Sequence, residues 1–213
     1  MPKDTWWNLS DEKRLAVTHA AMAEFGARGF SAGSLNVIAR EAGIAKGSLF
    51  QYFDDKLDFF TTVAEAGTSM IESSVLDGVD LENGGYFDCI HSLVANWLRF
   101  FRTHPLERSM AHAAASEIDA DARAAVRGVP NERYVKQLGP LAKRALATGE
   151  LRAGTDTNQL VAMTVLLLRH LDSAPFQPHV DPVLGLYDKS AKQVDRIASE
   201  LVDALQRAYG NPT

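Results

Sequence analysis

Thiols are almost absent from this sequence, because Cys89 is the only cysteine among its 213 residues. No intramolecular disulfide can form, so a small secreted fold held together by disulfides is excluded. This usage is typical of proteins in a reducing cytoplasm. We expect Cys89 to be a buried small hydrophobic residue rather than a redox sensor.

Long apolar runs are also missing. The longest, from Leu160 to Leu168, is interrupted by Thr164 and stops at Arg169, so it is too short to span a bilayer and indicates a buried helix. The first ten residues, MPKDTWWNLS, lack the apolar stretch of a secretory signal. We therefore expect a cytoplasmic protein with no membrane partner.

An excess of positive charge is the third thing the chain lacks. Its formal net charge is -5, which argues against a protein that coats nucleic acid without regard to sequence. Even in the first 60 residues, Asp and Glu slightly outnumber Lys and Arg. A sequence-specific DNA-binding protein remains compatible with this balance, because it needs only a few basic residues at the contact surface.

Alternating β-branched runs bounded by turn residues are absent, so the sequence predicts no strands. Apolar residues instead recur at helical spacing, which predicts an all-α fold of about nine helices. Gly84 and Gly85 break the chain, Gly128 and Pro130 separate two helices, and 173–187 is an irregular connector with three prolines. The nine helices are expected at residues 11–28, 35–42, 46–52, 55 to the late seventies, 86–103, from Pro105 onward, 131–148, 157–171 and 188–209, with another short helix at 117–127.

Residues 34–53, SLNVIAREAGIAKGSLFQYF, have the spacing of a helix-turn-helix. Ser34 is placed to cap the first helix, whose apolar face repeats at helical spacing, and Gly43 can adopt the left-handed conformation that ends it. The second helix would bury Leu49 and Phe53. Its other face carries polar side chains of the kind that read bases or neutralise phosphates in the major groove, namely Lys46, Ser48, Gln51 and Tyr52.

The run from Arg14 to Phe60 resembles the DNA-binding domain of the TetR family of bacterial transcriptional regulators. The first helix carries the pattern R-x-x-V-x-x-A-A-x-x-x-F-x-x-x-G-F from Arg14, and the motif reads I-A-x-x-A-G-I-x-K-G-S-L-F-x-Y-F from Ile38. The resemblance covers about a quarter of the chain. It implies a three-helix DNA-binding domain over residues 1–60, joined by a long helix to an effector-binding and dimerisation bundle over residues 61–213.

The resemblance also implies a function, a set of partners and three groups of residues. The chain would be a transcriptional repressor, a homodimer that binds a palindromic double-stranded operator and is released from it by a small hydrophobic effector, with no cofactor. DNA contacts would come from Ser34, Asn36, Lys46, Gly47, Ser48, Gln51, Tyr52 and Lys56. The effector would contact Trp97, Phe101, Met110, His112, Tyr134, Met163 and Leu167. The dimer interface would include Val161, Val165, Leu168, Ile197, Leu201 and Leu205.

Two positions depart from the family pattern. Ala45 stands where Ser or Thr usually caps the recognition helix, which removes a cap that contributes about 1 kcal/mol. Phe50 stands where Tyr is usual, so a hydroxyl that reaches phosphate is missing.

Acidic clusters offer a different interpretation, that of a metal site. Asp54, Asp55 and Asp58 form D-D-x-x-D, a magnesium-diphosphate motif in helical terpenoid synthases, but capping of a helix explains them better. Glu117, Asp119 and Asp121 alternate as in a calcium loop, but the required glycine is missing. The sequence has no metal-ligand spacing and no nucleophile motif, so we expect neither a metal site nor an enzyme. The alternative is a helical small-molecule-binding protein or enzyme on the same frame that has lost DNA binding.

Overall fold

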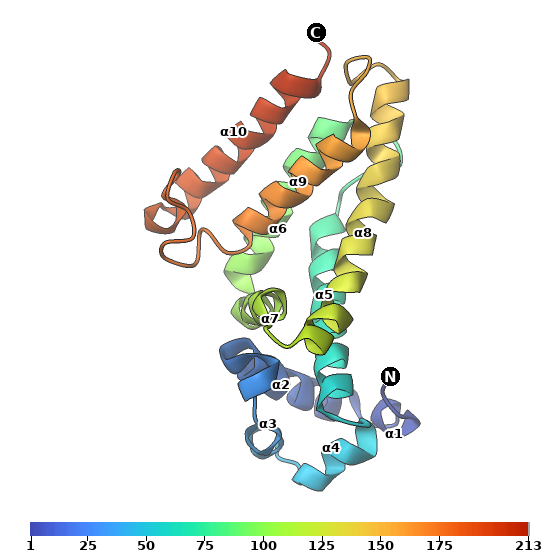
Figure 1. Cartoon of the computed structure of the whole chain (residues 1–213), viewed down its shortest axis with the longest axis vertical. Helices are drawn as coiled ribbons and strands as arrows, with labels where there is room; N and C mark the ends of the chain where they lie inside the picture. Colours follow the sequence, from blue (N-terminus) through green and yellow to red (C-terminus); the bar gives the residue numbers. More distant parts are fainter. Residues whose placement is uncertain (213) are drawn as a thin grey trace. The chain divides into compact units, whose positions relative to one another are not determined.

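The computed structural model describes residues 1–212, except for the side chains of residues 127–132 and 134. Its described elements are helices, and the one strand-like pairing is an isolated bridge between Leu151 and Gly210. The all-α prediction is confirmed (Figure 1). The chain forms two compact units: unit 1 is Met1–Ile71 with His104–Pro130, and unit 2 is Glu72–Thr103 with Asn131–Thr213.

Unit 1 is built around a phenylalanine-rich core. The Phe25, Ile38 and Phe60 side chains are fully buried, and the rings of Phe53 and Phe59 stack with centroids 4.4 Å apart. The contributing elements are α1 (Asp4–Trp7), α2 (Asp11–Ala32), α3 (Leu35–Glu41), α4 (Lys46–Tyr52), the first part of α5 (Lys56–Leu76), α7 (Pro105–Ser116) and the first part of α8 (Ala120–Ala147).

Unit 2 packs α6 (Tyr86–Thr103) against α9 (Thr157–Leu171) and α10 (Ala191–Tyr209), as Figure 1 shows. The carboxylate of Glu150 accepts the first backbone N–H groups of α6, from Tyr86 at 2.9 Å and Phe87 at 3.2 Å. The buried Tyr86 hydroxyl pairs with Thr164 at 2.8 Å. Burial raises the pKa of Tyr86 to about 12, so it stays neutral and can keep this hydrogen bond.

Polar pairs also join α6 to α10. His91 Nε2 lies 3.0 Å from Asp203 Oδ1, and Arg102 Nη2 lies 2.7 Å from Asp195 Oδ1. In the connector between α9 and α10, the Asp181 carboxylate accepts hydrogen bonds from the backbone N–H groups of Val183, Leu184 and Leu186. The connector ends in a short 3-10 helix, η1 (Leu186–Asp188).

Several predicted helix bounds are wrong. The helix expected at residues 11–28 continues to Ala32 as α2, with a kink at the non-helical Gly29. Residues 117–127 and 131–148 were expected as separate helices, but α8 is continuous over Ala120–Ala147. A proline removes one hydrogen bond from a helix, which a helix of 28 residues can tolerate. The last helix starts at Ala191 rather than 188, because Ser190 and Gln193 form a capping box there. The short α1 was not expected at all.

No helix in the described part of the chain is long and apolar enough to cross a membrane. Cys89 is buried, as expected, and burial raises the pKa of its thiol.

Candidate nucleic-acid interface

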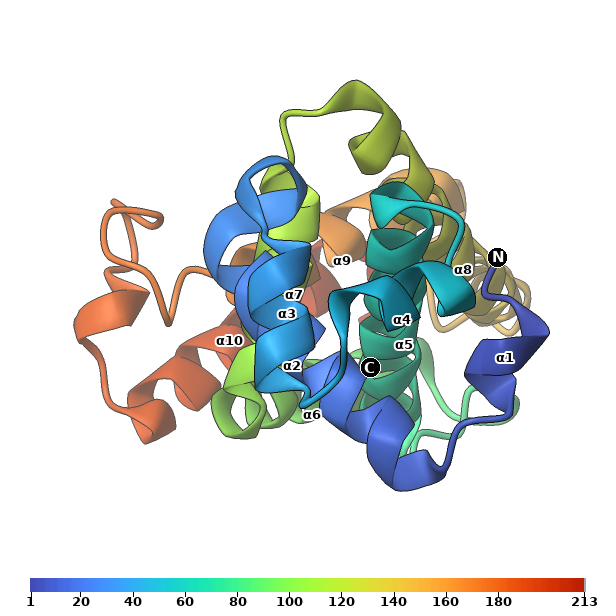
Figure 2. The same ribbon diagram turned by 90° about the horizontal axis from the view of Figure 1, so that it is seen from below.

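The helix-turn-helix forms as the sequence predicts, from α3, a glycine turn and α4 (Figure 2). Ser34 Oγ accepts the N–H of Val37 and caps α3. Gly43 has φ +67°, a left-handed conformation that a residue with a Cβ adopts only at a cost. The turn then returns through a hydrogen bond from Ile44 N to Ala39 O at 2.9 Å.

One face of α4 is exposed and mostly polar, although it also carries Phe50, which is 47% exposed. Lys46, Gly47 and Gln51 are exposed and Ser48 is half-buried, whereas Leu49 on the opposite face is buried in the core. Asn36 near the start of α3 is exposed as well, and Ser34 is half-buried with its hydroxyl committed to the cap. Five of the eight predicted DNA-contact residues therefore lie on α4, with an open polar surface around Lys46 and Gln51.

Tyr52 and Lys56 are less free than the sequence suggests. Tyr52 is half-buried, with its ring 6.0 Å from that of Trp6. Lys56 Nζ donates to Ser31 O at 3.2 Å and lies 4.9 Å from the centre of the Phe30 ring. Both side chains therefore make contacts within unit 1, in addition to any contact with DNA.

Residues that sequence reasoning missed lie at the C-terminal end of α4. Lys3 and Thr5 donate hydrogen bonds to the last carbonyl groups of the recognition helix, and Trp6 is buried against Phe53 with ring centroids 5.0 Å apart. The sequence pattern that could have indicated this contact is the apolar pair Trp6–Trp7 shortly before the Ser10 cap. Such large apolar side chains favour packing of this segment against another element.

Glu117 is a second missed residue. The residue is 5% exposed, and its carboxylate accepts hydrogen bonds from Phe30 N at 2.7 Å, Ser31 Oγ at 3.2 Å, and Ile118 N and Asp119 N at 3.0 Å. Burial acts to raise the pKa of Glu117, but the four hydrogen bonds outweigh it and the pKa is lowered. Gly29 supports this contact, since it has φ +70° and a Cβ there would lie 3.0 Å from Glu117 Oε2.

The acidic clusters serve as helix caps. Asp55 Oδ1 accepts Asp58 N at 2.8 Å at the start of α5, and Asp119 Oδ1 accepts Ala122 N at 2.9 Å at the start of α8. In the described part of the chain, no three His, Cys, Asp or Glu side chains are grouped to hold a metal ion.

Comparison with known proteins also indicates a helix-turn-helix in this part of the chain. Residues 17–63 match the family model of bacterial regulatory proteins of the tetR family. The matched residues contain the helix-turn-helix, so this part of the chain is similar to the DNA-binding domain of that family. The match covers most of α2, all of α3 and α4, and the start of α5.

Solved structures extend the similarity in fold to the whole chain. A TetR family transcriptional regulator from Chloroflexus aurantiacus J-10-FL is 21% identical, with a TM-score of 0.71 and full coverage of both chains. FadR from Bacillus subtilis, solved with stearoyl-CoA, is 15% identical with a TM-score of 0.70, covering 88% of this chain and 96% of its own. AibR, solved with isovaleryl coenzyme A and operator DNA, is 15% identical with a TM-score of 0.69, covering 90% and 97%.

The residues expected at the effector site are divided between the two units. In unit 2, Trp97 and Phe101 are buried with ring centroids 5.0 Å apart, Leu167 is half-buried, and Met163 is 39% exposed and accepts a hydrogen bond from the Tyr209 hydroxyl. In unit 1, Met110 lies in the core and His112 is exposed. The side chain of Tyr134 lies outside the described residues.

The residues expected at the dimer interface also separate by burial. Val161 and Leu168 are already buried within unit 2. Half-buried side chains are found at Val165, Ile197, Leu201 and Leu205. Leu166, which helical phase alone did not single out, is 67% exposed on α9.

Proposed function

We propose that this chain is a sequence-specific DNA-binding transcriptional regulator, with residues 1–60 as its DNA-binding domain and residues 61–213 as its effector and dimerisation domain. The observation that carries the proposal is the exposed polar face of α4, on a helix-turn-helix frame within the residues that match the family model. A helix of this size fits the major groove of B-DNA.

Within this proposal the residues of α4 have different roles in DNA binding. Gln51 is exposed and has the amide that can pair with an adenine edge, while Lys46 supplies a charge near phosphate. Gly47 lets the start of the helix approach the DNA backbone. Affinity rests on few basic residues, since the chain as a whole is acidic.

We propose a homodimer that works in the cytoplasm. Two recognition helices held about 34–36 Å apart would enter successive major grooves and make the operator palindromic. Exposed and half-buried apolar side chains on α9 and α10, including Leu166, Leu201 and Leu205, support pairing between copies.

The effector proposed for unit 2 is a hydrophobic small molecule that lowers operator affinity, which makes the regulator a repressor. The support is the apolar set Trp97, Phe101, Met163 and Leu167, together with the acyl-CoA thioesters in the structures of AibR and FadR. An effector acts by binding the DNA-incompetent state of the dimer more tightly than the DNA-competent state.

DNA selection tests the first part of the proposal. The purified protein is mixed with a pool of randomised duplexes, and bound DNA is amplified over several rounds. We expect a palindromic sequence to be enriched and to bind at least about a thousandfold more tightly than a scrambled duplex of equal composition. The Lys46→Ala/Gln51→Ala double variant should enrich nothing. A pool that stays random with the unmutated protein would support the small-molecule carrier or enzyme instead.

Release of the selected duplex tests the effector. Acyl-CoA thioesters of increasing chain length are added to the complex, and the anisotropy of the labelled DNA is followed. We expect release by an acylated thioester and not by free coenzyme A, and we expect Trp97→Ala to weaken release while DNA affinity is retained. Retention of DNA at every chain length would reject the acyl-CoA class.

A further inference from the structure

The recognition helix α4 is too short to be stable by itself. It has seven residues, and isolated helices of that length do not form in water. Its N-terminus has no side-chain cap, because Ala45 provides no acceptor. Something else in the structure must fix this helix.

The segment before α2 supplies what α4 lacks. The last carbonyl groups of a helix have no partners within it. Here Lys3 N donates to Tyr52 O at 2.9 Å, Lys3 Nζ donates to Phe50 O at 3.0 Å and Phe53 O at 3.2 Å, and Thr5 Oγ1 donates to Gln51 O. Four consecutive carbonyl groups at the C-terminal end of the recognition helix are therefore satisfied from two residues.

Charge and packing reinforce this cap. The Lys3 ammonium lies at the negative end of the α4 dipole and 3.0 Å from Asp54 Oδ1. Trp6 is 4% exposed and packs against Phe53 and Tyr52. Arg14 Nη1 fixes the far end of the segment by donating to Trp7 O at 2.9 Å and Leu9 O at 3.0 Å.

We propose that Lys3, Thr5 and Trp6 are positioning residues for operator recognition, which act through α4 rather than by contact with DNA. The clearest link is Thr5, whose hydroxyl bonds to the backbone carbonyl of Gln51, the residue assigned to base reading. A loosened C-terminal end of α4 lets Gln51 sample orientations that do not match a base edge. Sequence discrimination then falls, while the phosphate contacts that give nonspecific affinity remain.

The inference rests on the proposed DNA-binding function, so its first test uses no DNA. Backbone hydrogen exchange is measured by mass spectrometry on the unmutated protein and on Thr5→Val, which keeps the shape and removes the hydroxyl. We expect exchange in residues 49–53 to become about three- to tenfold faster, with exchange in α3 unchanged and Thr5→Ser restoring protection. Unchanged exchange in residues 49–53 would overturn the inference whatever the protein does with DNA.

The second test uses DNA selected by the unmutated protein and a scrambled duplex of equal composition. We expect Thr5→Val to lower the ratio of specific to nonspecific affinity about three- to tenfold, and Thr5→Ser to restore it. The salt dependence should be unchanged, because no phosphate contact is lost.

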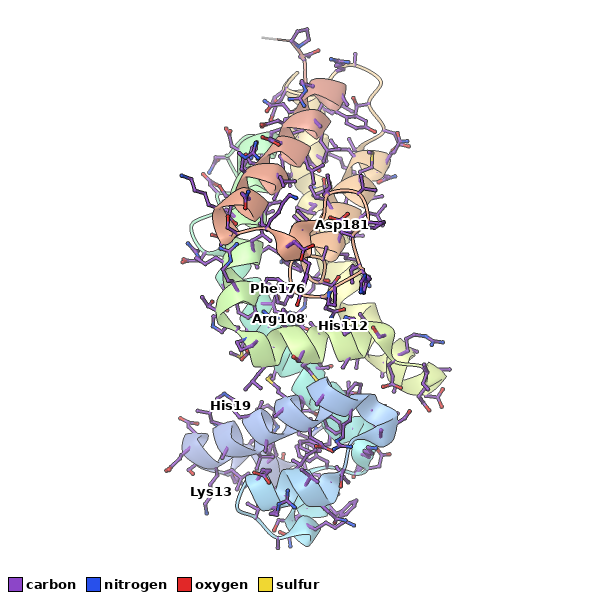
Figure 3. The ribbon with its side chains drawn as sticks, turned by 90° about the vertical axis from the view of Figure 1, so that its left-hand side faces the viewer. Lys13, His19, Arg108, His112, Phe176 and Asp181 are labelled. Carbon is purple, nitrogen blue, oxygen red and sulfur yellow. The ribbon has the colours of Figure 1, made fainter. Side chains whose placement is uncertain are left out.

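Lys3→Met should lower the same ratio, and Lys13→Met is its charge-matched control on the exposed surface of α2 (Figure 3). Equal loss from both lysine variants would mean a general effect of charge, and a reduced salt slope only for Lys3→Met would mean that Lys3 contacts phosphate. Either result would overturn the positioning role. If the unmutated protein selects no DNA but exchange responds as expected, the proposed function fails and the cap stands.

Discussion

At the scale of single residues, the side chains around α4 divide into those open to a partner and those already committed. Gln51 and Lys46 are exposed, while Tyr52 and Lys56 are engaged with Trp6, Ser31 and Phe30. We therefore expect substitutions at Gln51, Lys46 and Lys56 to affect base recognition, the salt dependence of DNA binding and stability to different extents.

Gln51→Ala tests base reading. We expect preference at one base pair of the operator to relax by about 1–3 kcal/mol, because a bidentate contact to a base edge is lost. The measurement is competition binding against operators changed at single positions. An unchanged ranking of those operators would remove Gln51 from the reading set.

Lys46→Ala and Lys56→Ala test charge against structure. Lys46→Ala should reduce the slope of log affinity against log salt by about 0.9 and leave stability unaffected. Lys56→Ala should also lower the free energy of unfolding by about 0.5–1 kcal/mol, because its contact with the Phe30 ring is lost. Salt titrations and urea unfolding separate the two effects, and equal stability of the two variants would contradict the structural role of Lys56.

At the scale of elements, Glu117 joins the segment between α7 and α8 to the turn at the end of α2. Its carboxylate lies 87 residues from Phe30 in sequence and bonds to the backbone N–H there. Backbone N–H groups in both segments donate their hydrogen bonds to this one buried carboxylate.

Glu117→Gln should destabilise the protein by about 2 kcal/mol at neutral pH, since an amide NH₂ would face backbone donors. The pKa of Glu117 is lowered by folding, so its contribution is present above the ordinary value of 4.5 and is lost as pH falls below that value through the folded pKa. The variant should show a weaker loss of stability over this acid range. Exposed Glu41→Gln is the control, expected to change stability by less than about 0.5 kcal/mol. Identical pH profiles for Glu117→Gln and the unmutated chain would refute this role.

At the scale of the whole molecule, the proposed function needs two copies of the chain. An apolar side chain remains open on α9 after unit 2 has folded, because Leu166 is 67% exposed. Large exposed apolar side chains on one face are typical of protein–protein contacts.

Leu166→Arg and Leu201→Arg should convert the dimer to monomers, because each places an unpaired charge in the proposed interface. Light scattering at micromolar concentration measures the mass. Ile118→Arg, an equally drastic change at a side chain 82% exposed on unit 1, should remain dimeric. A monomeric unmutated chain would end the dimer proposal.

The sequence by itself determined most of the helices, because their signals are local, although it missed α1 and divided α8. The side chains of Ser10, Ser34 and Asp156 accept hydrogen bonds from backbone N–H groups two or three residues further along the chain. Gly43 has a positive φ, which glycine adopts without a steric cost. The bounds of α4, α6 and α9 and the helix-turn-helix could therefore be predicted from short stretches of sequence. The domain boundary near residue 60 and the contact residues stay predictions.

Only the tertiary structure decided how α4 is held and which faces are covered. The donors that cap α4 come from residues 46 to 50 positions away, and such distant pairings leave no periodic signal in the sequence. The same reason explains why Val161 and Leu168 turn inward on α9 while Leu166 stays open. All three side chains are of types commonly found in protein cores. Whether each is buried depends on whether a neighbouring helix packs against its side of α9.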